Sequence, residues 1–336
     1  MNDLINSLPE NHRILVTGGA GFIGSACIRK LLLNTDAKIF NLDKINYCSD
    51  LKSIYDLNNK IGDKLERNYR LLKIDLANPV LTDQAIKESD PDLIINFAAE
   101  SHVDRSIENP GSFIHSNIVG TYNLLQSSLN HYNYLSGNRK NSFRFHHIST
   151  DEVFGSLGEN GKFNEGTKYD PRSPYSASKA SSDHLVNAWS STFGLPISIT
   201  NCSNNYGPWQ FPEKLIPLVI LKALSNKEIP IYGDGKNIRD WLYVDDHIDA
   251  ILKVAIKGKE GKKYCIGGKS ELTNIEVVSK ICSILNEYYP QKERHQNLIT
   301  YVADRSGHDR RYAIDASLIK NELGWKATYC FDTGLR

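Results

Sequence analysis

The stretch Arg13-Ile14-Leu15-Val16-Thr17-Gly18-Gly19-Ala20-Gly21-Phe22-Ile23-Gly24 decides the fold of this chain. Its first five residues form a short, mostly apolar run, which is typical of a buried parallel strand. The glycines lead into residues 25–33, which have a helical pattern. Strand, glycine-rich turn and helix in this order are the context of a dinucleotide-binding loop. The sequence therefore predicts an α/β fold that begins with a nucleotide site.

The three spaced glycines have separate roles in such a loop. Gly18 permits the tight turn, Gly21 lets the backbone approach a pyrophosphate, and Gly24 lets the helix pack on the strand. The pyrophosphate would bind the free N–H groups at the start of the helix.

Two acids at later strand ends are candidate cofactor contacts. Asp43 follows Gly24 by 19 residues, close to the spacing of a carboxylate that binds the adenosine ribose. A carboxylate there would repel a 2′-phosphate, so we expect NAD rather than NADP; the alternative is an ordinary turn residue. Asp75 would lie near the adenine, or would cap the next helix.

The other apolar runs extend this start into a doubly wound, Rossmann-type parallel sheet. Six strands are expected, at Arg13–Thr17, Lys38–Asp43, Leu71–Leu76, Leu93–Ala99, Phe143–Ser149 and Pro196–Thr200. Turn-forming residues after Thr200 indicate a change of lobe. We therefore expect a nucleotide-binding domain over 11–200, to which 236–260 return, and a smaller C-terminal α/β substrate lobe made of 201–235 and 261–336.

Composition is that of an ordinary globular protein, with 40% hydrophobic and 24% charged residues. A net charge of +1 gives no reason to expect nucleic acid or a membrane surface as partner. The polar start of the chain and the lack of an 18-residue apolar run predict neither a signal peptide nor a membrane span. Six scattered cysteines argue against a metal site and for a reducing cytoplasm.

Tyr175 and Lys179 form the first candidate catalytic pair. Pro174 suits the first turn of a helix, where positions i and i+4 share a face. The cation beside the phenol would favour the phenolate and make its oxygen a proton acceptor. A lone pair with this spacing is more often an accidental exposed pair, so its neighbourhood decides.

That neighbourhood is the end of the fifth strand. Thr150, Asp151 and Glu152 follow it directly, and ligands of open parallel sheets bind at this edge. We therefore expect the hydroxyl and the two carboxyl groups to face Tyr175 and to move protons, rather than to be solvated acids of a loop. Small Ala98 and Ala99, after the fourth strand, would let a cofactor lie against the backbone.

Arginines near the end of the chain form a candidate nucleotide clamp. Residues 304–311 contain Arg305 and Arg310, and guanidinium forks suit a diphosphate. Either would act with Arg239. The alternative is a solvated charged face.

With these motifs in place, the chain resembles the extended short-chain dehydrogenases/reductases that act on nucleotide-sugars. Within them it is most similar to the dTDP-glucose 4,6-dehydratases, through Ala98–Asp104, Thr150–Val153, Ser173–Lys179, Cys202–Pro208, Arg239–Val244 and Asp304–Arg311. The resemblance implies an NAD-dependent hydro-lyase that is usually a homodimer paired through the regions 112–130 and 175–193.

The resemblance also implies a mechanism. Tyr175, assisted by Lys179 and Thr150, removes the C4 hydroxyl proton while hydride passes to NAD. Glu152 removes the C5 proton, Asp151 protonates the leaving C6 hydroxyl, and hydride returns to C6.

The site residues that it implies fall into two groups. The cofactor contacts are Gly18, Gly21, Phe22, Ile23, Gly24, Asp43, Asp75, Leu76, Ala98, Ala99, Ser101, Ser116, Tyr175, Lys179 and Asn205. The dTDP-glucose contacts are Ser101, Thr150, Asn204, Lys214, Leu215, Pro230, Tyr232, Arg239, Asn274, Asp304, Arg305 and His308.

The chain departs from the family pattern in two places. Phe154 stands where we expect tyrosine, which removes one hydroxyl and leaves both acids. The sequence stops at Arg336, where relatives usually continue into a helix, so we expect an uncovered apolar strip on the second lobe.

Two other functions are open. A UDP-sugar 4-epimerase or decarboxylase would share the glycine loop and the Tyr175–Lys179 pair, but has no use for the Asp151–Glu152 pair. A non-catalytic dinucleotide-binding scaffold has no need to keep Tyr175 and Lys179. Nucleotide selectivity among dTDP, UDP, CDP and GDP depends on the second lobe.

Overall fold

The structure is a computed structural model that describes residues 8–9, 11–304 and 307–336. In this part of the chain, seven strands form one parallel sheet with the order β10-β6-β5-β4-β1-β2-β3. The strands are β1 (Arg13–Thr17), β2 (Lys38–Asp43), β3 (Tyr69–Lys73), β4 (Leu93–Asn96), β5 (Arg144–Thr150), β6 (Ile197–Cys202) and β10 (Lys263–Ile266). This large sheet confirms the predicted Rossmann-type fold class.

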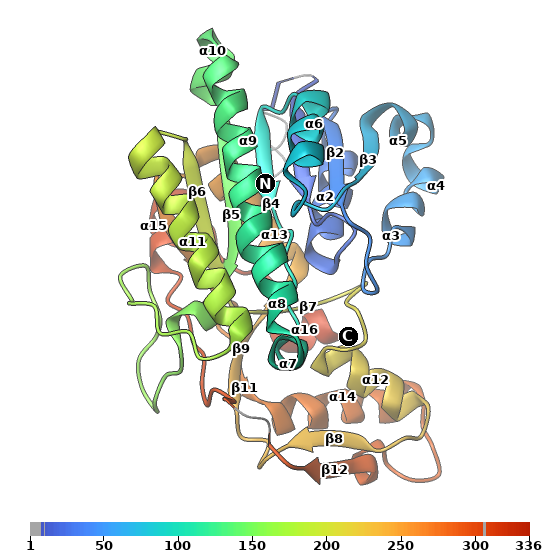
Figure 1. Cartoon of the computed structure of the whole chain (residues 1–336). Coiled ribbons are helices and arrows are strands. Elements are labelled where there is room, and N and C mark those ends of the chain that lie inside the picture. The colour runs from blue at the N-terminus through green and yellow to red at the C-terminus, as the bar shows by residue number, and fades with distance from the viewer. Residues whose placement is uncertain (1–7, 10, 305–306) are drawn as a thin grey trace.

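Helices cover both faces of the large sheet (Figure 1). One layer contains α2 (Phe22–Asn34), α13 (Val244–Lys257) and the short helices α3 (Lys52–Tyr55), α4 (Asn58–Ile61) and α5 (Asp63–Asn68). The other contains α6 (Pro79–Ser89), α9 (Gly120–Tyr134) and α11 (Pro174–Phe193). Ile14 and Val16 pack into the first layer and Leu15 into the second, so β1 is buried on both faces, as its apolar run predicts.

Short elements connect or extend these layers. They are α7 (Val103–Glu108), α8 (Pro110–Phe113), the π-helical turn η1 (Ile114–Val119), α10 (Gly137–Ser142) and the 3₁₀ turn η2 (Asp151–Phe154). Within the described ranges, no helix is long and apolar enough to span a bilayer.

The strand order reverses between β1 and β4. From β1 the chain builds outward through β2 to β3, then crosses to β4 and continues through β5 and β6. Such a switch point leaves a crevice at the carboxyl ends of the two strands, because their connections leave in opposite directions. The glycine loop after β1 and the small residues after β4 lie at this crevice.

A smaller lobe lies beyond this edge of the sheet (Figure 1). Its strands are β7 (Asn204–Tyr206), β8 (Ile229–Tyr232), β9 (Ile238–Tyr243), β11 (Glu271–Thr273) and β12 (Ile299–Val302). They form a three-stranded sheet, β11-β9-β7, and a two-stranded sheet, β12-β8. Its helices are α12 (Leu215–Leu224), α14 (Asn274–Tyr288), the 3₁₀ turn η3 (His295–Leu298) and α16 (Phe331–Leu335). Phe331 packs against Tyr206 and Trp241 in the core of this lobe.

Two segments that the sequence assigned to the smaller lobe pack on the large one. Strand β10 pairs with β6 as the outermost strand of the large sheet. Helix α15 (Ser317–Leu323) and Trp325 bury their apolar side chains against β10 and α13. The expected lobe range 261–336 is therefore wrong for these segments. A four-residue strand carries no local signal for the sheet that it joins, since only pairing with β6 decides it.

Candidate active site

A cavity of about 310 Å³ lies at the carboxyl ends of β1, β4 and β5, within the size range of small-molecule sites. Every residue that the sequence assigned to cofactor or catalysis lines it. These are Gly18, Gly21, Phe22, Ile23, Gly24, Asp43, Asp75, Leu76, Ala98, Ala99, Ser101, Ser116, Thr150, Asp151, Glu152, Tyr175, Lys179 and Asn205. Of the expected substrate contacts, Asn204 and Lys214 line it as well.

At Gly18 and Gly24 the glycine loop has no room for a side chain beside the neighbouring backbone. A Cβ on Gly18 would lie 2.7 Å from the backbone nitrogen of Ala98, and Gly18 has a positive φ of 67°. A Cβ on Gly24 would lie 2.3 Å from the carbonyl oxygen of Gly18. Gly21 precedes α2 and provides no side-chain cap, which leaves N–H groups of the first helical turn available to an anion.

Asp43 holds the glycine loop in place from the end of β2. One carboxylate oxygen accepts a hydrogen bond from the backbone N–H of Ala20 at 3.0 Å. The other accepts from the backbone N–H of Ile45 at 2.8 Å. Asp75 accepts from the backbone N–H of Ala77 at 2.9 Å, and Asn78 is the residue that caps α6. Of the two interpretations of Asp75, the helix cap is therefore wrong.

The first turn of α11 orients the Tyr175–Lys179 pair. Ser173 and Ser176 form a reciprocal capping box, and Pro174 occupies the first turn. Tyr175 is buried and packs edge-on against Phe113, with the ring centroids 6.3 Å apart. The helix therefore fixes both side chains on the face that lines the cavity.

Burial and the negative charge of Glu152 raise the pKa of Tyr175 well above its ordinary value. A hydrogen bond with Thr150 opposes this rise. In the chain alone, burial therefore disfavours the phenolate of Tyr175 more strongly than the hydrogen bond with Thr150 favours it, and the effect of Lys179 on Tyr175 stays a prediction.

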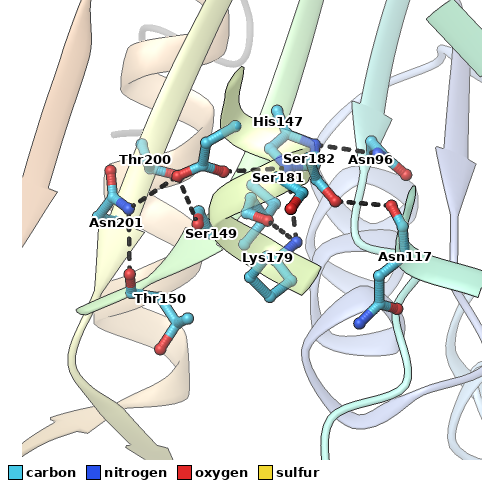
Figure 2. Close-up of polar contacts among 12 residues, drawn as sticks. Asn96, Asn117, His147, Ser149, Thr150, Lys179, Ser181, Ser182, Thr200 and Asn201 are labelled. Atoms are coloured by element: carbon cyan, nitrogen blue, oxygen red, sulfur yellow. Dashed lines mark hydrogen bonds and ion pairs between the residues drawn. The ribbon is translucent and has the colours of Figure 1, made fainter. Parts of the chain in front are cut away.

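The Lys179 ammonium binds the backbone of β5. It donates to the carbonyl oxygen of Ile148 at 2.8 Å and lies 3.5 Å from Nε2 of His147 (Figure 2). Burial lowers the pKa of Lys179, while the negative charge of Asp183 opposes that shift. Lys179 is thus a buried amine anchored to the central sheet.

The two acids after β5 have different surroundings. Thr150 caps η2 by accepting from the backbone N–H of Glu152 at 3.2 Å, and its hydroxyl donates to Asp151 at 3.3 Å. Asp151 is buried, and burial followed by the negative charges of Glu152 and Asp240 raises its pKa well above the ordinary value. Its Oδ2 has no hydrogen-bond partner within the described residues. These surroundings favour the protonated form of Asp151, and Oδ2 is the oxygen that can donate that proton.

Asn117 supports the wall of the cavity. The π-helical turn η1 brings its side chain to the segment after β4, where it accepts from the backbone N–H of Glu100 at 2.8 Å and donates to the Glu100 carbonyl at 3.0 Å. It also donates to the hydroxyl of Ser178 on α11 at 2.8 Å. Asn117 thus joins the segment after β4 to α11.

The remaining expected substrate residues belong to the smaller lobe and are not among the residues that line the cavity. Leu215 begins α12, Pro230 and Tyr232 lie on β8, and Asn274 begins α14. Asp304 binds His308 at 2.6 Å. These residues stay predicted contacts, and Arg305 lies outside the described residues.

The predicted arginine clamp is only partly assembled. Arg239 is buried, donates to the carbonyl oxygen of Asp309 at 2.9 Å, and places its guanidinium 4.2 Å from the ring centroid of Tyr312. Arg310 is exposed and pairs with Asp234 at 2.9 Å. Of the two described arginines, Arg239 is thus the one with a fixed, buried guanidinium.

Buried polar atoms along the cavity fit a polar ligand. The side-chain oxygens of Asn204, Asn205 and Gln210 have no partner within the described residues, and all three residues line the cavity. Unpaired buried acceptors are costly, so a ligand with hydrogen-bond donors would stabilise them. Together with the glycine cradle, they fit a dinucleotide and a sugar. In the described chain, no cluster of His, Cys, Asp and Glu side chains forms a metal site.

Comparison with known proteins identifies the family. The family model for GDP-mannose 4,6 dehydratase matches residues 15–336. The chain is 52% identical to a protein of Sinorhizobium fredii named probable dTDP-glucose 4,6-dehydratase, over 96% of this chain and 91% of that protein. The chain belongs to the dTDP-glucose 4,6-dehydratase family.

Two solved members of the dTDP-glucose 4,6-dehydratase family have the same architecture. The enzyme of Bacillus anthracis, in complex with NAD, is 43% identical with a TM-score of 0.83, and the match covers 96% of this chain and 94% of that one. The enzyme of Streptomyces venezuelae, with NAD bound, is 38% identical with a TM-score of 0.85 and the same coverage.

The departure from the dehydratase family pattern at Phe154 is accommodated by packing. The ring is buried, with its centroid 5.3 Å from that of Phe163 and 5.4 Å from that of Tyr169. The lost hydroxyl is therefore replaced by an aromatic contact, and both acids keep their positions in the cavity.

Sequence reasoning missed three residues in this dehydratase site. Glu213 lines the cavity and binds the hydroxyl of Tyr47 at 3.0 Å, across 166 residues of chain, so it has no local signal. His147 and Asp183 lie behind Lys179. Asp183 follows Lys179 by four residues, and the helical face shared by Tyr175, Lys179 and Asp183 was the signal that could have found it.

Proposed function

We propose that this protein converts dTDP-glucose to dTDP-4-keto-6-deoxyglucose with NAD as its cofactor. The observation that carries the proposal is the buried Asp151, whose pKa is raised well above its ordinary value, beside Glu152 in the cavity that contains Tyr175. A 4-epimerase needs only the proton acceptor and the cofactor. A water elimination also needs a proton donor and a separate base, and adjacent acids in different surroundings supply both.

The glycine loop and Asp43 would hold NAD. When bound there, NAD supplies the acceptor for the hydride of sugar C4 and later the donor of hydride to C6. The residues of this chain then handle the protons.

In the first step, Tyr175 accepts the proton of the C4 hydroxyl, which Thr150 holds by a hydrogen bond. The Lys179 ammonium favours the phenolate that precedes this transfer. The resulting C4 ketone makes the C5 proton acidic.

In the second step, Glu152 removes the C5 proton and Asp151 donates its proton to the C6 hydroxyl, which leaves as water. Glu152 returns its proton to C5 when C6 is reduced. Tyr175 has then gained one proton and Asp151 has lost one, so one proton exchanged through solvent closes the cycle.

The nucleotide would extend toward the smaller lobe. Its proposed contacts are Asn204, Lys214 and Leu215 near the cavity, Pro230 and Tyr232 on β8, Arg239, Asn274, and Asp304 and His308. Arg239 is the best candidate for the diphosphate, since a fixed guanidinium presents two parallel N–H groups.

Incubation of the purified protein with dTDP-glucose, without added NAD, tests the proposal. We expect a 4-keto-6-deoxy sugar, followed by its absorbance after alkali, and loss of product in Glu152→Gln. Product from a different nucleotide-glucose, with none from dTDP-glucose, would show that dTDP is not the nucleotide of the substrate. A C4 epimer as the only product, or no product even with NAD added, would overturn the reaction.

Two further properties are proposed. We infer a homodimer through α9 and α11, because Tyr122 and Phe193 are about half exposed and pack on either side of Trp189. Sedimentation equilibrium that gives a monomer would contradict it.

The free state of all six cysteines supports a cytoplasmic location. A location in an oxidising compartment, found by cell fractionation, would contradict it.

A further inference from the structure

A buried carboxylate stands behind the Tyr175–Lys179 pair. Asp183 is fully buried, one helical turn after Lys179 on α11. Its Oδ2 accepts hydrogen bonds from Ser149 at 2.9 Å, Tyr169 at 2.6 Å and Asn201 at 3.3 Å. These donors come from β5, from the segment before α11 and from β6. Three converging donors hold a buried charge that helix formation alone does not require.

The hydrogen-bond network assigns the proton of His147. Thr17 donates its hydroxyl proton to the Asn96 oxygen at 2.6 Å, which turns the Asn96 amide nitrogen toward Nδ1 of His147 at 3.0 Å (Figure 2). Nδ1 is therefore the acceptor, and Nε2 bears the proton. Nε2 lies 3.4 Å from Oδ1 of Asp183. Burial, followed by the charge of Lys179, lowers the pKa of His147 to about 4, so the ring is neutral.

Asp183 is consequently the anion that faces the Lys179 cation. Around Lys179 lie Tyr175 and Asp183 on its own helix, the neutral His147 on β5 and the Cys202 thiol on β6, whose pKa is raised by burial. Asp183 itself is faced by Tyr169 and, from β10, by Lys263. Asp151 and Glu152 face Tyr175 on the cavity side. Burial raises the pKa of Asp183, but contacts with His147 and Lys179 outweigh it and lower the pKa.

The same carboxylate supports the strand end that bears the two acids. Asn201 donates to the carbonyl oxygen of Thr150 at 3.0 Å and to Asp183 with the same amide group (Figure 2). The backbone before Asp151 and the helix that bears Lys179 therefore share one anchor.

We propose that Asp183, aligned by His147, is a positioning residue that keeps the Lys179 ammonium charged and directed at the proton transfer of Tyr175. The inference rests on the proposed function for its catalytic consequence, since the charge of Lys179 matters only if Tyr175 accepts a proton. Asp183 acts through Lys179 and does not touch the substrate. Without this anion, a cation buried in the wall of the cavity loses its proton more easily.

Asp183→Asn tests this inference, because it keeps the shape of the side chain and removes its charge. The titration of Lys179 is followed by the ¹³Cε chemical shift in lysine-labelled protein, with the signal assigned by Lys179→Arg. We expect the pKa of Lys179 to fall by about 1 unit or more, as expected for the loss of a close charge in a poorly solvated site. The alkaline limb of kcat/KM should move down by the same amount, with KM nearly unchanged.

Asp92→Asn is the matched control. Asp92 is also a buried carboxylate, but it binds Arg139 at 2.7 Å and the backbone N–H of Arg13 at 3.0 Å, at the opposite end of the large sheet. The Asp92→Asn variant should lower Tm without changing the pKa of Lys179 or the pH profile of kcat/KM. An Asp183→Asn protein with a lower Tm and an unchanged Lys179 titration would overturn the proposal.

If Asp183→Asn does not fold, the titration of Lys179 in the wild-type protein tests the proposal. Lys179 that remains protonated through pH 8 supports the proposal, and Lys179 that loses its proton below pH 7 overturns it. This readout does not depend on turnover. A protein inactive on dTDP-glucose would contradict the proposed function and would leave the Asp183–Lys179 result intact.

Discussion

The catalytic edge of the large sheet and the substrate side of the smaller lobe hold their charges in different ways. At the catalytic edge, which comprises residues 147–152 and 175–183, Asp151, Lys179 and Asp183 are all buried. On the substrate side, which comprises residues 229–239 and the described part of 304–311, the Asp234–Arg310 pair has both side chains about half exposed. The first region has desolvated titratable groups in a fixed network, and the second has charges at the surface.

This difference indicates separate tasks. Charges out of water interact strongly and need no rearrangement at the moment of reaction, which suits proton transfer. Exposed pairs contribute little to stability and can exchange partners at low cost, which suits recognition of a charged ligand. Arg239 is the exception on the substrate side, since it is buried against Tyr312.

The largest expected effect comes from Tyr175→Phe at the catalytic edge. The variant keeps the buried ring and its contact with Phe113 but loses the proton acceptor. We expect kcat to fall roughly 10²- to 10⁴-fold, as for loss of a general base, with little change in Tm. Tyr289→Phe, at an exposed position after α14 in the smaller lobe, is the control. A variant with more than a tenth of wild-type activity would assign the proton transfer to another group.

A smaller effect is expected from Arg239→Lys on the substrate side. Lysine keeps the positive charge near Asp151 but loses the planar fork. Loss of one charge-assisted hydrogen bond predicts a rise in KM of about tenfold or more, with kcat changed less than about threefold. Arg310→Lys, whose partner is Asp234, should change KM less. A larger rise in KM for Arg310→Lys than for Arg239→Lys would make Arg310 the diphosphate contact.

The smallest expected effect concerns the acid sensitivity of the large lobe. His247 on α13 is fully buried, and burial lowers its pKa to about 3 from 6.5. Below pH 6.5 the unfolded chain therefore binds a proton at His247 that the folded chain does not bind. The contribution of the neutral His247 to the free energy of unfolding is complete above pH 6.5 and declines toward pH 3. Between pH 6.5 and 5 this group alone costs about 2 kcal/mol.

His247→Leu checks this sign. The drop in Tm from pH 7 to pH 5 should be smaller in the variant than in the wild type. His184→Gln changes an exposed histidine and should leave the drop unchanged. Burial also raises the pKa of Asp240 to about 6, which acts in the opposite direction as the pH falls. An unchanged drop in His247→Leu would mean that His247 is not buried in its neutral form.

Much of the fold and of the catalytic edge was predictable from the sequence. The β1 run, the glycine spacing and the acids after β5 are local signals, because a strand end or a single helical turn fixes where such side chains lie. The spacing of Tyr175 and Lys179 likewise predicts a shared face. What local spacing did not reveal was the direction of the pKa shifts: burial raises the pKa of both Tyr175 and Asp151, and burial is a property of the folded chain.

By itself, the sequence determined the first six strands of the large sheet, the glycine-rich loop and the polar residues that line the cavity. Only the tertiary structure decided that β10 and α15 belong to the large lobe, that Glu213 reaches Tyr47, and that His147 stands behind Lys179. The physical reason is the separation along the sequence between the residues in contact. Helix and strand periodicity fix neighbours within a few residues, whereas these contacts join segments that come together only when the sheet and the lobes assemble.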